Sequence, residues 1–266
     1  MDDAVMQEKS QIYEGAVRRR RETEEKIRRG GKIDLGACYA IMSNSHFVMG
    51  LYDYITKRDM SGLKQNLYIA CKLHLAALTL DSEGRLQTPM PLLWAILSDS
   101  TSIIDEMSNF DQGDYAENKK NPRYPQFMVN MYQMAIRSDF DGLRRGLDVL
   151  RKKGEKADRD RAKSGRDFFS LLMLRDNESL EKEISAKVTA EAANPMAEGI
   201  VSVISTLEAK ICWMHGIEVA IDSDLVPKDF LPVRPLVKYS DEYDFLSIGY
   251  ERKGLISRLL GGIFSR

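Results

Sequence analysis

A helix–turn–helix pattern that recurs about every 40 residues is the feature that most constrains the fold of this chain. Each occurrence has an aspartate where an apolar run stops, at Asp59, Asp99, Asp139 and Asp176. A bulky apolar residue lies seven positions before each aspartate, and two more lie four and eight positions after it. These spacings put the apolar residues on one face of each helix, and the aspartate can accept hydrogen bonds from the first N–H groups of the second helix. The pattern predicts an all-α fold, an array or bundle of helical hairpins with TPR- or HEAT-like repetition.

The clearest hairpin spans residues 168–184. Phe168, Phe169 and Leu172 form the apolar face of its first helix, and Leu180 and Ile184 continue that face after the turn. The recurrence has two interpretations: true structural repetition, or a chance likeness among hairpins of similar length. Both interpretations predict packed helical pairs.

Composition places the 266-residue chain among soluble globular proteins, with 43% hydrophobic and 30% charged residues. The formal net charge of −1 gives no global field for nucleic acid or an anionic membrane. Three widely spaced cysteines favour a reducing compartment over a disulfide framework. No run is long enough to span a membrane, and the first residues lack the layout of a signal peptide. We therefore expect a cytoplasmic protein that binds neither nucleic acid nor membrane.

We expect one domain overall, made of a charged N-terminal helix over 1–30, a helical-hairpin domain over 31–216 and an irregular tail over 217–266. The first helix has a thin apolar seam of Ile12, Val17 and Ile27. Its four consecutive arginines, 18–21, alternate in space with glutamates, which favours a solvated face over a nucleic-acid patch.

Several later segments depart from the hairpin pattern. The polar and proline-containing pattern of residues 111–126 predicts the longest irregular loop of the chain. Long ordered loops in compact helical domains are often functional. The polar stretch 155–166 predicts a solvated connection or a short exposed helical turn, and a long apolar helix is expected over 197–215. The alternating stretch 217–222 predicts an extended segment, and residues 255–264 predict a short basic amphipathic helix.

Catalytic signatures are absent from the sequence. There is no glycine-rich phosphate loop, Walker motif or nucleophile elbow, and we expect no enzyme, no cofactor and no metal. Cys71 and His74 resemble half of a metal site without a second pair, so a packed cysteine and histidine are the favoured interpretation. A Cys–His nucleophilic pair stays open, although no local signature supports it.

Residues 127–235 resemble the immunity-49 family of bacterial polymorphic-toxin immunity proteins. The resemblance rests on the hairpin 168–184 with its Leu-x-Arg-Asp turn, on the apolar stretch 200–216 that ends in glycine, and on the acidic, apolar and proline-containing segment 217–227. It implies an all-helical cytoplasmic protein that binds a cognate effector toxin. It implies no catalytic residues, and the N-terminal half of the chain lies outside it.

The resemblance implies an immunity protein that neutralises a secreted effector toxin by occluding its active site. The alternatives are a helical-repeat scaffold for another protein or peptide, and an enzyme with an unrecognised site. The first candidate surface is acidic and aromatic and could mimic the charge of a nucleic-acid substrate; its members are Asp222, Asp224, Tyr239, Asp241, Glu242, Tyr243 and Asp244. The opposing interpretation is a solvated tail whose aromatic side chains pack on the body. The second candidate is the irregular loop, with Asp111, Asp114, Tyr115 and Tyr124. The sequence does not indicate an oligomeric state.

Overall fold

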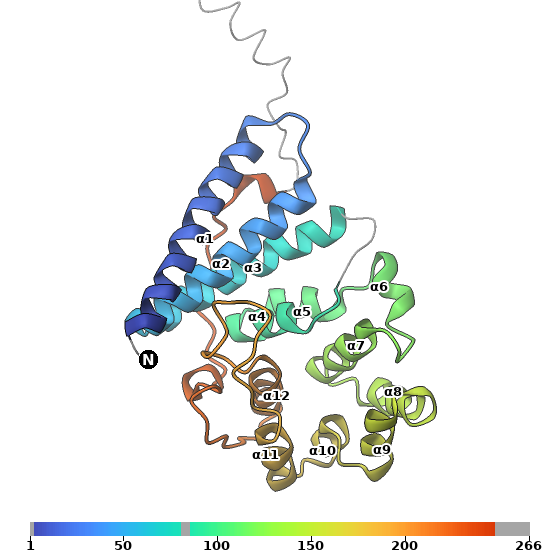
Figure 1. Cartoon of the computed structure of the whole chain (residues 1–266). Helices are drawn as coiled ribbons and strands as arrows, with labels where there is room; N and C mark the ends of the chain where they lie inside the picture. The colour runs from blue at the N-terminus through green and yellow to red at the C-terminus, as the bar shows by residue number, and fades with distance from the viewer. Residues whose placement is uncertain (1–2, 81–85, 248–266) are drawn as a thin grey trace, which may run out of the picture. The chain divides into compact units, whose positions relative to one another are not determined.

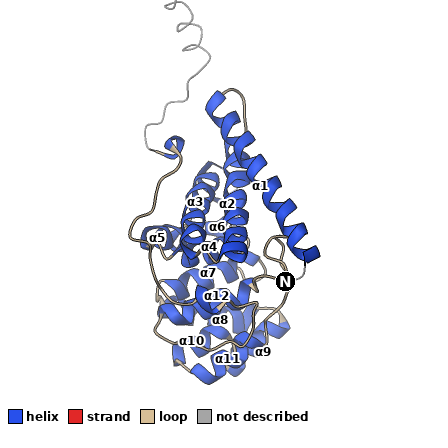
Figure 2. Cartoon of the chain, turned by 90° about the vertical axis from the view of Figure 1, so that its left-hand side faces the viewer, coloured by secondary structure: helices blue, strands red, loops and turns tan. Residues whose placement is uncertain are grey.

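The computed structural model describes residues 3–80 and 86–247, and this part of the chain is helical with no β-strand (Figure 2). The all-α prediction is confirmed, and the alternating stretch 217–222 forms no strand. The helix expected over 255–264 lies outside the described residues. The chain forms two compact units, residues 1–81 with 238–266, and residues 82–237. These boundaries differ from the expected single domain divided at residues 30 and 216, because the tail divides between the units.

The first unit is built on three long helices, α1 (Asp3–Arg29), α2 (Leu35–Lys57) and α3 (Met60–Leu80). Short connections join them, and α2 packs against both α1 and α3 (Figure 1). Gly50 is required where α2 crosses α3, because a Cβ there would lie 2.8 Å from the Cβ of Asn66. The short 3-10 helix η2 (Asp244–Leu246), near the end of the described chain, contacts α3.

The inward face of α1 differs from the expected seam. Ile27 is buried as expected, whereas Ile12 and Val17 are only half-buried. Ala16 and Thr23 lie on the buried face instead, one heptad apart. Small side chains at these positions let the backbone of α1 approach its neighbour closely, an effect that a search for large apolar residues misses.

The second unit contains nine α-helices among its described residues, and its centre is α12 (Val203–Met214), which contacts α4, α7 and α11. Every residue of α12 from 205 to 212 is buried, as expected for a helix enclosed on all sides. The other helices are α4 (Met90–Ser98), α5 (Thr101–Asn109), α6 (Gly113–Asn118), α7 (Pro125–Ile136), α8 (Phe140–Lys153), α9 (Lys156–Ser164), α10 (Phe168–Leu174) and α11 (Asn177–Ser185), followed by the 3-10 helix η1 (Lys228–Phe230).

Two of these helices correct the sequence-based boundaries. The helix expected over 197–215 begins only at Val203, because Gly199 has a positive φ of 68° and the chain before Ser202 forms turns. The loop expected over 111–126 contains the short helix α6. The stretch 155–166 forms the short, largely exposed helix α9, one of the two alternatives predicted for it.

The recurring aspartates lie at helical turns, and three of them cap as predicted. The carboxylates of Asp59, Asp139 and Asp176 accept hydrogen bonds from backbone N–H groups three residues later, at 2.9, 2.8 and 3.1 Å. The residue before each of these three aspartates has a left-handed backbone, with φ between 54° and 62°. Such a residue ends one helix and turns the chain into the next.

Asp99 differs from the other three turn aspartates. It has the left-handed backbone itself, with φ 57°, and Ser100 takes the N-cap position of α5. This shift of one residue directs the carboxylate of Asp99 into the core, where it is 2% exposed. The four turns therefore share a local geometry without sharing one role for the aspartate.

None of the helices in the described part of the chain combines the length and the apolar character needed to cross a bilayer.

Candidate functional site

The acidic and aromatic residues predicted near the end of the chain form a segment, residues 239–246, that packs on α1, α2 and α3. Its aromatic side chains fasten it: the ring of Tyr239 stacks on Tyr68 at 4.9 Å, and Phe245 stacks on Tyr39 at 5.8 Å. Tyr243 and Phe245 are only 2% and 6% exposed. These aromatic residues belong to the core of the first unit, as the opposing interpretation of the tail predicted.

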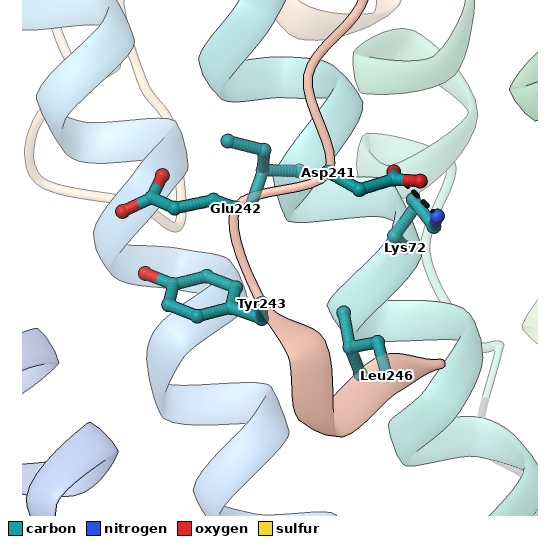
Figure 3. Close-up of a pocket in the computed structure, with 6 residues that line it drawn as sticks. Lys72, Asp241, Glu242, Tyr243 and Leu246 are labelled. Carbon is teal, nitrogen blue, oxygen red and sulfur yellow. Dashed lines mark hydrogen bonds and ion pairs between the residues drawn. The ribbon is translucent and has the colours of Figure 1, made fainter. Parts of the chain in front are cut away.

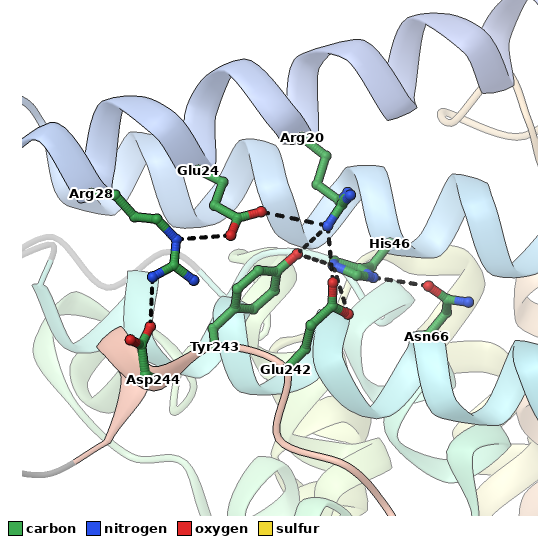
Figure 4. Close-up of polar contacts among 8 residues, drawn as sticks. All are labelled: Arg20, Glu24, Arg28, His46, Asn66, Glu242, Tyr243 and Asp244. Atoms are coloured by element: carbon green, nitrogen blue, oxygen red, sulfur yellow. Dashed lines mark hydrogen bonds and ion pairs between the residues drawn. The ribbon is translucent and has the colours of Figure 1, made fainter.

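A chain of hydrogen bonds holds the hydroxyl of Tyr243 between α1 and α2 (Figure 4). Asn66 Oδ1 lies 2.8 Å from His46 Nδ1, so this nitrogen carries the donated proton and Nε2 accepts from the Tyr243 hydroxyl at 2.7 Å. Arg20 donates to the same tyrosine oxygen at 3.0 Å. The amide of Asn66 is oriented by a bond from its nitrogen to the carbonyl of Gly62. The Tyr243 hydroxyl, the His46 ring and the Asn66 amide are hydrogen-bonded inside the unit, whereas the buried Nε of Arg20 has no hydrogen-bond partner among the described residues.

Three carboxylates of the segment form ion pairs with the same helices. Asp241 lies 2.6 Å from the ammonium of Lys72, Glu242 lies 2.9 Å from Arg20, and Asp244 lies 2.9 Å from Arg28. The hydrogen bond from Lys72 holds the pKa of Asp241 below its ordinary value. The negative charge of this segment is therefore largely neutralised within the molecule, and little of it remains to attract a basic partner.

A hollow beside the segment is too small for a ligand. Its lining includes Lys72, Asp241, Tyr243 and Leu246, and its volume is about 10 Å³ (Figure 3). A volume of this size holds at most about one water molecule. The hollow is a packing feature of the docked segment.

Docking of the segment should weaken in acid. Burial lowers the pKa of His46, the bond to Asn66 and the charge of Glu242 oppose this, and Arg20 adds to it. A histidine released from this environment binds a proton below about pH 6.5, whereas the docked one resists it. The contribution of docked His46 to the free energy of unfolding should be fully present above that pH. Below that pH it should decrease, by at most about 1.4 kcal/mol per pH unit for one proton.

The measurement is thermal melting of the wild type and of His46→Gln between neutral and mildly acidic pH. The wild type should lose stability more steeply than the variant, since glutamine keeps an acceptor for Tyr243 and does not titrate. Parallel curves for the two proteins would show that His46 is not the titrating group.

The remaining predicted residues of this surface lie in the second unit. Asp222 and Asp224 are exposed in the irregular segment that follows α12. They belong to a different compact unit from residues 239–246. The sequence cluster is therefore divided between two bodies.

The second predicted surface is divided between core and solvent. Tyr115 is fully buried, and its hydroxyl donates to Oε1 of Gln133. Asp111 forms an ion pair with Lys119 at 2.8 Å. Asp114 and Tyr124 are exposed, the latter by 47%. Of the predicted set, Tyr115 is therefore in the core, Asp111 is exposed but paired, and Asp114 and Tyr124 are exposed.

The second unit contains a basic groove that the sequence motifs do not predict. It has a volume of about 900 Å³, and its charged lining residues are Lys120, Arg123, Lys152, Lys153, Arg159 and Glu155. The side chains of its five cations make no ion pair with any described residue. We refer to this surface, completed by Asn121, Pro122 and Gly154, as the basic groove.

Local interactions hold the two sides of the groove. On the side before α7, Asn121 accepts a bond from the backbone N–H of Arg123 at 3.1 Å, which closes the turn that carries Lys120 and Arg123. On the other side, Gly154 ends α8 in a crowded position, because a Cβ there would lie 2.6 Å from the carbonyl oxygen of Leu150. Arg151 then ties α9 to α8 by donating to the carbonyl of Ala162 at 3.0 Å.

The signal for the groove was present in the sequence as regional charge. Residues 119–166 contain 14 lysines and arginines and 6 aspartates and glutamates, an excess of eight positive charges. The rest of the chain then carries nine more acidic than basic residues, because the total is −1. Net charge over the whole chain hides this asymmetry, and a charge count over windows reveals it.

Two further charged clusters lie inside the second unit. The ammonium of Lys210 lies 2.7 Å from Asp99, and it donates to the carbonyl of Pro232 at 2.9 Å. Glu208 accepts from Lys187 at 2.8 Å and from the hydroxyl of Tyr132 at 2.8 Å. Burial raises the pKa of Glu208, and Lys187 opposes that shift. The Lys210–Asp99 pair is enclosed, whereas Glu208 is buried and its partner Lys187 is partly exposed.

The candidate nucleophile Cys71 is fully buried. Burial raises the pKa of its thiol far above the ordinary value, and burial lowers the pKa of His74 to about 4. A buried neutral thiol and a neutral imidazole three residues later give no support to the Cys–His pair that the sequence left open. Among the described residues, no group of three histidine, cysteine, aspartate or glutamate side chains is placed to hold a metal ion.

Comparison with family models, with curated proteins and with solved structures finds no match to this chain.

Proposed function

We propose that this chain is a cytoplasmic immunity protein, which binds a cognate secreted toxin, occludes its active site and catalyses no reaction itself. The observation that carries the proposal is the basic groove, in which five cations that make no ion pair with the described residues line an open volume of about 900 Å³. Unneutralised like charges repel each other, and a partner of opposite charge removes that repulsion on binding. Lys152, Lys153 and Arg159 lie within residues 127–235, the part of the sequence that resembles toxin-immunity proteins. Lys120 and Arg123 lie just before that stretch.

The toxin-facing surface is then not the acidic tail segment. Its carboxylates are paired with Lys72, Arg20 and Arg28, and two of its aromatic residues are buried. A partner would have to break these contacts before it could use them. The basic groove needs no such rearrangement, which favours it as the first contact.

Co-expression with a toxin tests the proposal. The C-terminal domain of the effector encoded next to this protein should arrest bacterial growth when it is expressed alone. Co-expression of the wild-type chain should restore growth. Lys120→Glu with Arg123→Glu should abolish protection, because it reverses two charges in a loop without burying a new group. Arg144→Glu with Arg145→Glu, on the exposed face of α8 outside the groove, is the charge-matched control and should protect as the wild type does.

Soluble expression of each variant is measured in parallel, so that loss of protection is not confused with loss of protein. Failure of the wild-type chain to protect against the adjacent domain would remove the immunity proposal.

A helical scaffold for another protein is the second candidate. The observation that favours it is the left-handed turn at residues 58, 99, 138 and 175, which recurs between consecutive helices as it would in an array of hairpins. Affinity capture followed by growth rescue separates the two candidates. A scaffold would retain a partner that has no toxicity, whereas an immunity protein would retain the toxin domain.

A further inference from the structure

We propose that the basic groove docks an acidic polypeptide segment of the partner protein, and that nucleic acid is not its ligand. The inference rests on the proposed function in taking the partner to be a protein, and it adds the chemistry by which that protein is recognised. Three observations carry it: the cations that have no ion pair within residues 3–80 and 86–247, the polar character of the lining, and the acidic charge of the rest of the chain.

The charge balance of its lining distinguishes the groove from local ion pairs on other helices. Lys57 pairs with Asp53 one turn away at 2.7 Å, and Lys182 pairs with Glu178 at 2.6 Å. In the groove the only carboxylate among the lining residues is Glu155, against five cations. The missing negative charges are the ones that a ligand would supply.

The lining selects among anionic ligands. Small-molecule sites are enclosed mainly by apolar and aromatic side chains, whereas Pro122 is the one apolar side chain of this lining. Single-stranded nucleic acid is bound by cations together with aromatic platforms for the bases, and no aromatic residue lines the groove. A chain of carboxylates needs neither an apolar enclosure nor a stacking platform.

The two arginines fit carboxylates in particular. Arg123 lies on the loop side and Arg159 on α9, and each planar guanidinium can hold one carboxylate through two parallel hydrogen bonds. Lys120, Lys152 and Lys153 surround them as mobile point charges. This combination suits several carboxylates spaced along one polypeptide segment.

The charge outside the groove limits the size of the anion. Residues outside 119–166 carry an excess of nine negative charges. The net negative charge of the remainder disfavours the approach of a long polyanion such as duplex DNA. A limited acidic patch on a protein needs to approach only the groove, and electrostatic complementarity of this kind selects partners.

Binding of defined probes to the full chain tests the inference. The probes are an oligoglutamate peptide, a single-stranded oligodeoxynucleotide of the same formal charge, and inorganic phosphate. Fluorescence anisotropy or calorimetry at about 0.05 M and 0.2 M salt gives affinity and its salt dependence. The peptide should bind more tightly than the oligonucleotide at both salt concentrations, and phosphate should not displace it.

Variants locate the binding. Lys120→Glu with Arg123→Glu should weaken peptide binding at least about tenfold, and so should the milder Lys152→Gln with Lys153→Gln, because each removes two attractive charges. The control Arg144→Glu with Arg145→Glu should stay within about twofold of the wild type. Circular dichroism of each variant verifies the fold, and the two groove variants alter different elements, so a folding defect in one leaves the other informative.

Three outcomes would overturn the inference: tighter binding of the oligonucleotide, displacement of the peptide by phosphate, or equal peptide affinity in all variants. These results are separable from growth rescue. Peptide binding that requires the groove, without protection from the adjacent toxin, would support the groove chemistry and reject the immunity function. Protection that survives both groove variants would support immunity and reject the groove as its docking site.

Discussion

Replacement of Lys210 by methionine should destabilise the second unit by about 3–5 kcal/mol, because it leaves the Asp99 carboxylate charged in the core without its cation. Lys210 is 0% exposed and Asp99 is 2% exposed, so water cannot replace the lost partner. The backbone N–H of Arg234, 3.0 Å from the Asp99 carboxylate, is a dipole and cannot supply the missing charge. Urea unfolding should show a lower midpoint with an unchanged slope.

A second substitution gives this prediction its internal check. Asp99→Asn combined with Lys210→Met removes both charges, and asparagine tolerates the left-handed backbone at position 99. The double variant should therefore recover much of the lost stability. Lys182→Met, which removes the exposed cation of an i,i+4 pair, should leave the midpoint unchanged. Equal losses in the single and double variants would mean that the size of the lysine side chain, and not charge pairing, stabilises the site.

Leu180→Asp should cost the second unit at least about 4 kcal/mol. Leu180 is 0% exposed, so the substitution forfeits about 1.5–3 kcal/mol of apolar burial and also buries a carboxylate without a partner. Leu143→Asp, also at 0% exposure, should have a comparable effect. The measurement is the unfolding midpoint in urea or the melting temperature.

Leu174→Asp is the matched control for these core substitutions. Leu174 ends α10 in the same unit, but 71% of it is exposed, so a carboxylate there remains hydrated and should change stability little. A melting temperature that is unchanged in both Leu180→Asp and Leu143→Asp would mean that the helical phase assigned to these hairpins is incorrect.

The hairpins were predictable because the interactions that form them are local. Asp59, Asp139 and Asp176 each cap a helix through an N–H group only three residues away, and Leu180 and Ile184 follow Asp176 at helical spacing. Such spacing is a property of the sequence itself. The start of α12 at Val203 was not predictable in this way, since apolar residues continue through the turns that precede it.

The candidate surfaces were harder to predict, because their state depends on partners far along the chain. Glu242 pairs with Arg20 across 222 positions, and no local pattern in the tail shows that this charge is already neutralised. The basic groove was partly readable as an excess of charge over residues 119–166. That excess did not reveal that Lys120 and Arg159, 39 positions apart, line one hollow.

The sequence alone determined that this protein is built from capped amphipathic helices, because capping and apolar periodicity act within a few residues. Only the tertiary structure decided what the individual charges do. A shift of one residue in the backbone turned Asp99 from an expected cap into the buried partner of Lys210. Packing of residues 239–246 on α1–α3 paired their carboxylates with Lys72, Arg20 and Arg28, while the cations of the groove make no ion pair within the described part of the chain. The physical reason is that electrostatic pairing depends on distance in space, which the fold sets and the order of residues does not.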